Sequence, residues 1–313
     1  MSRPKIAALR VVLAVGALLL GLLVAGASYR PNTEIPAGFS GHHVMLGDLP
    51  IRVLSEGQGR DVLLIHGCPG SLEEFRPLMD ALARNFRVTA YDRPGHGFSG
   101  DGGEYSYDYN AQIAHRLIEQ LGLQHVIVVG HSFGGGTALA SALRKHPSVD
   151  AYVVVDAALY HPSRPPTMVM RALSAPWLGL GLARALVGSL GPRMFRKGIE
   201  RQFVGHPPSQ EFVDLRVRIW SSPKVAHALA VETTGATEWL PEMSSHYGKI
   251  EQPLVIVAQK ENPFRREGAQ RLQRQVAGSR LSLVANSGHY LQFEQPEQVV
   301  AAIRLAASAT PRP

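Results

Sequence analysis

A short apolar run that ends in a glycine-flanked serine constrains this chain more than any other feature. Residues His125 to Val129 predict a buried strand, and Thr137 to Ala140 predict a helix. Between them stands Gly130-His131-Ser132-Phe133-Gly134. A serine in such a strand-turn-helix elbow is held in a strained backbone conformation that small neighbours permit, which lifts its hydroxyl clear of the sheet edge. It also lies at a helix N-terminus, which favours negative charge. We interpret Ser132 as a candidate nucleophile.

The segments around this elbow alternate between strands and helices. Near-continuous Val and Ile in the strands indicates burial on both faces of a parallel sheet. The sequence predicts an α/β fold with a mostly parallel eight-stranded sheet, helices on both faces and an antiparallel start. Besides the strand before the elbow, the expected strands are two within Gly41 to Glu56, then Asp61 to Gly67, Arg87 to Asp92, Ala151 to Asp156, Pro253 to Ala258 and Leu281 to Ala285. The expected helices are Leu72 to Arg84, Tyr107 to Leu121 and Pro296 to Ala307.

The alternation breaks between residues 158 and 249. This stretch is Pro-rich and reads as helical pieces, which we interpret as a helical cap inserted into the sheet domain. The expected helices are Thr167 to Leu190, Arg193 to Phe203, Pro208 to Ser221 and Pro223 to Thr233. The chain would then divide into an N-terminal segment (1–30), a first part of the core (37–157), the cap (158–249) and a second part of the core (250–308).

The N-terminal segment carries a targeting signal. Arg3, Lys5 and Arg10 precede an uncharged run from Val11 to Ser28. Eighteen residues of helix cover roughly 27 Å, about the thickness of a bilayer's hydrocarbon core. We therefore expect a membrane anchor within residues 5–28, with the remaining chain on the non-cytoplasmic side (periplasmic or extracellular). A signal peptide cleaved at Ala25-Gly26-Ala27, which would release a secreted protein, is the alternative.

Composition excludes some classes of function. With 45% hydrophobic residues, the 313-residue chain can bury a large core. Its net charge of +7 is modest, and Lys and Arg are scattered without a dense basic patch, so nucleic-acid binding has no support. A single cysteine, Cys68, rules out an intrachain disulfide.

Several motifs resemble those of the α/β-hydrolase family. Gly130 to Gly135 is similar to its Gly-His-Ser-x-Gly-Gly elbow, His66-Gly67-Cys68-Pro69-Gly70 to its His-Gly-x-Pro-Gly loop, and Asp92 to Ser99 to its turn after the fourth strand. The resemblance extends from about Gly41 to Leu305. It implies an acyl-transfer enzyme with a Ser-His-acid triad.

The other catalytic residues are assigned by position. A serine needs a nearby base, and His289, in the loop after the last strand, is our candidate. The resemblance places the acid at Glu261, where many family members carry Gly-x-x-Asp; Asp156, at the end of an earlier strand, is the alternative. The backbone N–H groups of Phe133 and Cys68 would form the oxyanion hole.

The remaining polar residues receive structural interpretations. We interpret His131 as structural, the Cys68 side chain as a small buried group, and the Asp92 to Ser99 segment as a turn. His96 has no second His or carboxylate at helical or turn spacing, so we expect no metal, and no cofactor-binding residue is identified.

The serine points to esters, thioesters or amides, because related dehalogenases and epoxide hydrolases carry Asp at the elbow. We expect a hydrolase of carboxylic esters acting on a small, apolar acyl substrate. The alternatives are a carbon-carbon bond hydrolase, a cofactor-free perhydrolase with the same triad, and a non-catalytic membrane-tethered binding protein. The cap should roof an apolar cavity bounded by Ser132, Cys68 and Phe133 with cap residues such as Trp177 or Phe203.

Overall fold

A central eight-stranded sheet organises the protein. The computed structural model describes residues 3–30, 32–176, 178–204 and 208–310. Strand order across the sheet is β1-β2-β4-β3-β5-β6-β7-β8; β2 pairs antiparallel with both β1 and β4, and the remaining pairings are parallel. The predicted fold class is therefore confirmed. The strands are β1 (His42–Leu46), β2 (Leu49–Glu56), β3 (Arg60–Ile65), β4 (Phe86–Tyr91), β5 (Val126–His131), β6 (Val149–Val155), β7 (Leu254–Gln259) and β8 (Arg280–Val284).

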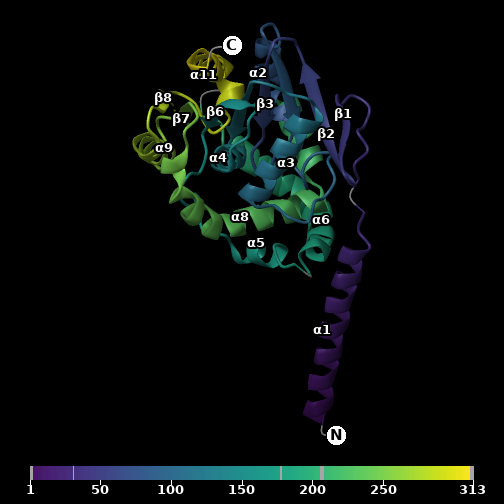
Figure 1. Cartoon of the computed structure of the whole chain (residues 1–313). Coiled ribbons are helices and arrows are strands. Elements are labelled where there is room, and N and C mark those ends of the chain that lie inside the picture. The colour runs from purple at the N-terminus through teal and green to yellow at the C-terminus, as the bar shows by residue number, and fades with distance from the viewer. Residues whose placement is uncertain (1–2, 31, 177, 205–207, 311–313) are drawn as a thin grey trace.

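Helices cover both faces of the sheet (Figure 1). One face packs against α3 (Tyr107–Gln120), α4 (Phe133–Arg144) and α9 (Pro263–Gln275). The other face packs against α2 (Arg76–Leu82) and α11 (Pro296–Ala309). Strands β3 and β5 to β7 are buried along nearly their whole length, as the runs of Val, Ile and Leu indicate. Shorter helical turns are η1 (Leu72–Phe75), η2 (Tyr247–Lys249) and α10 (Leu291–Glu294).

Four helices between β6 and β7 form the cap, defined here as residues 168–244. They are α5 (Met168–Leu173), α6 (Gly179–Glu200), α7 (Gln210–Trp220) and α8 (Pro223–Ser244).

The sequence predicts that one helix ends at Leu190 and another begins at Arg193. This break is wrong, because α6 continues through Pro192. Burial of the apolar side chains of Val187 and Ile199 in the cap holds this helix together despite the lost backbone donor. Helix α9 was not predicted, because it has few apolar positions. Its start was marked by Asn262, whose side chain accepts a hydrogen bond from Arg265 N–H, followed by Pro263.

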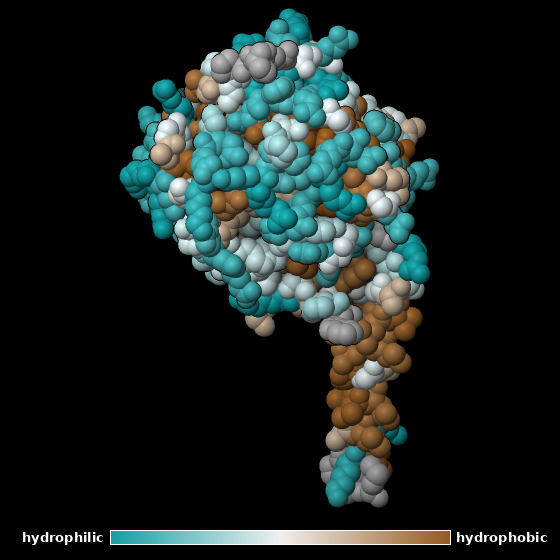
Figure 2. All heavy atoms as spheres, viewed as in Figure 1, coloured by the Kyte–Doolittle hydropathy of each residue, from teal (hydrophilic) through white to brown (hydrophobic). Residues whose placement is uncertain are grey.

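The N-terminal helix α1 (Arg3–Ala27) projects away from the globular part (Figure 1). Its segment Lys5–Ala27 has a mean hydropathy of 2.5 and is long and apolar enough to cross a membrane. Figure 2 shows this helix as a hydrophobic rod below a largely hydrophilic body. A cleaved signal sequence has the same properties.

Candidate active site

Ser132 occupies a strained turn between β5 and α4. Its φ of 56° and ψ of −116° lie in a region that non-glycine residues rarely adopt. A Cβ atom on Gly130 would overlap the Gly134 carbonyl, and one on Gly134 would overlap the carbonyl of Ile65. The turn can therefore form only because glycine stands at both positions, which explains the motif around the serine.

His289 lies beside this serine, as predicted from its position after the last strand. Its Nε2 atom is 3.0 Å from Ser132 Oγ, which is hydrogen-bonding distance. The His289 backbone is held from two sides. His131 Nε2–H donates to the His289 carbonyl at 2.9 Å, and the His289 N–H donates to the carbonyl of Gln202 in the cap at 2.8 Å. His131 therefore supports the position of the base, consistent with a structural role.

The carboxylate that contacts His289 belongs to Asp156 and not to Glu261. Asp156 Oδ2 lies 2.6 Å from His289 Nδ1. The same carboxylate accepts hydrogen bonds from the backbone N–H and side-chain amide of Gln259, at 3.1 and 2.7 Å. Asp156 directly follows β6, which pairs with β5, so its side chain starts one strand away from the serine elbow. The geometry brings together Ser132, His289 and Asp156.

Glu261 serves a different contact, which corrects our preference for it as the acid. Its Oε1 accepts a hydrogen bond from the backbone N–H of Asn286 at 3.2 Å, at the start of the loop that carries His289. Glu261 follows β7, one strand further from β5 than Asp156. The carboxylate thus braces the loop and does not orient the imidazole.

The local electrostatics keep the imidazole neutral and the carboxylate charged. Burial, together with the positive charge of Arg265, lowers the pKa of His289 to about 4. Burial alone would raise the pKa of Asp156, but the hydrogen bond from His289 and the charge of Arg265 outweigh it and lower that pKa. Arg265 Nε lies 3.7 Å from Asp156 Oδ2. At neutral pH the imidazole is therefore free to accept a proton.

The loop after β3 passes next to the serine. A Cβ atom on Gly67 would come within 2.9 Å of Ser132 Cβ, so glycine is needed for this approach. Cys68 follows in the chain, and Phe133 begins α4, whose first N–H groups have no intrahelical partner. The two segments expected to supply oxyanion donors thus flank Ser132.

A buried ion pair anchors this loop to the cap. Arg93 donates hydrogen bonds to the carbonyls of His66 at 3.1 Å and Gly67 at 2.9 Å. It pairs with Glu232 of α8 through contacts of 2.5 and 3.1 Å, and both side chains are fully buried. Burial would raise the pKa of Glu232, but Arg93 and His96 lower it to about 2. The sequence reading of residues 92–99 as a turn missed this pair, because nothing in the sequence links positions 139 residues apart.

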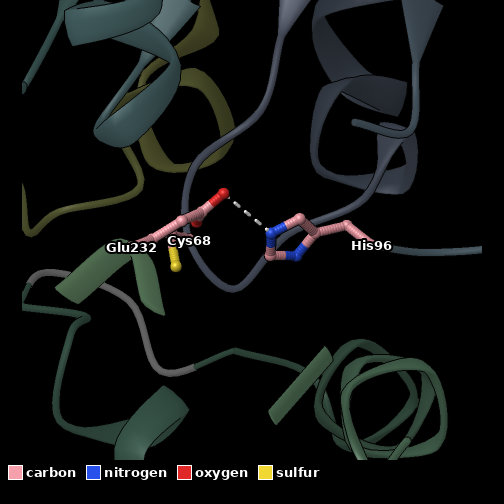
Figure 3. Close-up of side chains that lie close together, drawn as sticks. All are labelled: Cys68, His96 and Glu232. Atoms are coloured by element: carbon pink, nitrogen blue, oxygen red, sulfur yellow. Dashed lines mark hydrogen bonds and ion pairs between the residues drawn. The ribbon is translucent and has the colours of Figure 1, made fainter. Parts of the chain in front are cut away.

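Cys68 and His96 lie close to Glu232, the acidic partner of this ion pair (Figure 3). Their donor atoms lie within 4.8 Å of one another, a spacing that would permit a metal ion. The donor set does not fit one, because Glu232 is already neutralised by Arg93, whose Nη2 lies 3.3 Å from His96 Nε2. Burial and the Glu232 charge also raise the pKa of the Cys68 thiol well above its usual value. We therefore assign this cluster a structural role.

The cap lies over the site. Besides the Gln202 contact to His289, the Phe203 ring stacks on Tyr290 with a centroid separation of 5.1 Å. Trp177, the other expected roof residue, lies outside the described residues.

Phe133 stacks on Tyr107 with a centroid separation of 4.1 Å. A surface hollow of about 300 Å³ is lined by Tyr107, Ala140, Leu143, Trp239 and Met243 among others.

The chain is similar to known hydrolases. Residues 62–302 match the family model described as the alpha/beta hydrolase family. A 2-hydroxy-6-oxo-2,4-heptadienoate hydrolase of Pseudomonas putida is 27% identical over 84% of this chain and 93% of its own length. Protein PHYLLO of Arabidopsis thaliana is 24% identical over 85% of this chain, which spans only 16% of that protein. A solved structure described as a membrane phospholipase A has a TM-score of 0.70 and 21% identity, and covers 98% of this chain and 99% of its own.

Proposed function

Because the chain belongs to the α/β-hydrolase family, we propose that it is a serine hydrolase acting on a carboxylic ester or related acyl substrate. The hydrogen-bonded line from Ser132 Oγ through His289 to Asp156 carries this proposal. It provides a nucleophile, a neutral base and a buried carboxylate that fixes the tautomer of the base.

In the proposed mechanism His289 Nε2 takes the proton of Ser132 as Oγ forms a bond to the acyl carbon. The carbonyl oxygen becomes an oxyanion that accepts hydrogen bonds from the backbone N–H groups of Phe133 and Cys68. His289 then returns the proton to the departing alcohol as the carbon-oxygen bond breaks. Water, deprotonated by the same imidazole, then bonds to the acyl carbon, and His289 returns that proton to Ser132 Oγ as the bond from Oγ to the acyl carbon breaks and the acid leaves.

Carbon-carbon bond hydrolysis is the second candidate, favoured by similarity to the P. putida hydrolase over most of both chains. A cofactor-free perhydrolase would use the same three residues. The intact hydrogen-bonded line argues against a non-catalytic binding protein, in which nothing would maintain a strained serine beside a neutral histidine.

We also propose that residues 5–28 anchor the protein in a membrane, with the catalytic part on the non-cytoplasmic side. The unburied apolar helix α1 supports an anchor, and the basic residues before it support this orientation. Release after cleavage at Ala27 is the alternative.

An activity-based experiment tests the proposed chemistry. The full chain in detergent is treated with a fluorophosphonate probe and assayed with esters of graded acyl length. Wild type should be labelled and active, and Ser132→Ala neither. Ser245→Ala, at an exposed serine in the loop after α8, is the matched control and should behave as wild type. Equal labelling of Ser132→Ala and wild type would disprove the assignment.

A further inference from the structure

The end of the N-terminal helix is packed tightly against the cap. A Cβ atom on Gly26 would lie 3.1 Å from the backbone nitrogen of Gly181, and one on Gly181 would overlap the carbonyl of Leu22. Arg184 of α6 also donates a hydrogen bond to the carbonyl of Ala25 at 2.8 Å. Two glycines thus let α1 and α6 touch backbone to backbone, which fixes the start of α6 against the last turns of α1.

This contact sets the height of the cap relative to a bilayer. The apolar span is Lys5–Ala27, and Leu22 lies five residues before its end, which is roughly 7.5 Å along the helix axis. With α1 across a membrane, the start of α6 therefore lies at the boundary between headgroups and hydrocarbon. Helix α5 lies at the same end of the globular part (Figure 1).

At this level, the surface of the cap and of the segment that leads into it is apolar and basic. Met168 is 80% exposed and Val169 51% exposed, at the first turn of α5. Arg164 and Arg171, on either side of them, are also exposed. The sequence contains no Asp or Glu between residues 157 and 199. Exposed apolar side chains among unopposed arginines are suited to a lipid interface that carries negative charge.

We propose that residues 164–171, together with the first turn of α6, dock on the surface of an anionic lipid bilayer. We name this segment the docking face. The proposal rests on the membrane anchoring proposed above and extends it, since a tether alone would leave the cap free of the lipid. Met168 and Val169 enter the interfacial layer, while Arg164 and Arg171 pair with lipid phosphates. The cap that covers Ser132 is thereby held next to the acyl chains of the membrane lipids.

Fluorescence quenching in vesicles tests the docking face. The full chain is reconstituted into phosphatidylcholine vesicles with or without phosphatidylglycerol, some of which carry a nitroxide near the headgroup. A bimane label is placed through Met168→Cys or Val169→Cys. Leu305→Cys is the matched control, because Leu305 is also an exposed apolar residue (43%) but lies on α11, at the end away from α1. The wild-type chain gives the labelling background from Cys68.

The nitroxide should reduce fluorescence at positions 168 and 169 by about twofold or more and leave position 305 nearly unchanged. Phosphatidylglycerol should increase the quenching, and the added substitutions Arg164→Gln and Arg171→Gln should weaken that increase by several fold. Equal, weak quenching at 168 and 305 overturns the proposal. If the label at position 168 is not quenched but becomes shielded from water as the number of chains per vesicle grows, the docking face contacts a second copy of the chain. That result would also overturn the proposal.

A label at Leu13→Cys, inside the span, separates the two proposals. Quenching there by a mid-chain nitroxide together with no quenching at 168 means that the anchor stands and the docking face fails. No quenching at position 13 would overturn the membrane anchoring and, with it, the docking proposal, while leaving the serine chemistry untouched.

Discussion

The buried pair of Arg93 and Glu232 makes a quantitative prediction for Glu232→Gln. The pKa of Glu232 falls from an ordinary 4.5 to about 2 in the folded protein. A difference of about 2.5 units corresponds to about 3 kcal/mol of folding free energy. Removing one partner of a buried pair typically costs about 3–5 kcal/mol, because the other charge remains buried. We expect Glu232→Gln to destabilise the protein by about 3 kcal/mol.

Thermal and chemical unfolding measure this effect. For a chain of 313 residues, with an unfolding entropy of about 2.1 cal/mol/K per residue, 3 kcal/mol corresponds to a fall in Tm of roughly 5 °C. The matched control is Glu238→Gln, on the same helix but exposed, which should change stability by less than about 0.5 kcal/mol. Because Arg93 also holds the carbonyls of His66 and Gly67, Glu232→Gln should lower kcat more than it changes KM.

The pH dependence supplies the refuting result. A carboxyl whose folded pKa is lowered stabilises the protein fully above its unfolded pKa of about 4.5, and this contribution is lost as pH falls toward about 2. The gap in stability between wild type and Glu232→Gln should therefore be largest near neutral pH and narrow below pH 4.5. A gap that is absent at pH 7, or unchanged in acid, would refute the reasoning.

Three further predictions concern the site and the anchor. Asp156→Asn should lower kcat by about 10³–10⁴-fold, because the neutral amide can turn an N–H toward His289 Nδ1 and so favour the wrong tautomer of the imidazole, while Glu261→Gln should leave turnover nearly unchanged. Steady-state kinetics that show the reverse would return the acid role to Glu261. The kcat/KM of the wild type should fall as pH drops through about 4, the pKa of His289. In Arg265→Gln this fall should occur at a higher pH, because a charge that lowers the pKa of His289 is gone. A fall at the same pH in both proteins would contradict the electrostatic assignment. After a carbonate wash the full chain should stay with membranes, and a reporter active only outside the cytoplasm should be active when fused after Pro313; a soluble product that begins at Ser28 would show cleavage instead.

The local chemistry of the elbow could be predicted from the sequence, because strand, glycines, serine and helix are contiguous. The sequence prediction preferred Glu261 over Asp156 because it followed a family position and not the sheet, whereas the structure places Asp156 against His289. Only the observed order β5-β6-β7 shows that a side chain leaving β6 starts nearer the elbow than one leaving β7. Gln259, whose amide donates to Asp156, was a signal that the end of β7 supports a carboxylate from elsewhere.

The cap was harder to predict for a different reason. Its helices take their stability from contacts between distant segments, so Pro192 could be accommodated where local propensity predicts a break. The pairing of Arg93 with Glu232 likewise cannot be predicted locally, because nothing in the sequence distinguishes Glu232 from the other two glutamates of α8.

The bond from the His289 N–H to the Gln202 carbonyl has a consequence for how the enzyme is loaded. His289, the proposed base, takes part of its backbone support from Gln202 of the cap, so lifting that part of the cap would loosen the base while exposing the serine to bulk water. If the cap opened, His289 would lose this bond and would be less well placed to accept a proton. A substrate would have to enter past the closed roof or wait for it to return, and premature reaction of a half-seated molecule would be suppressed.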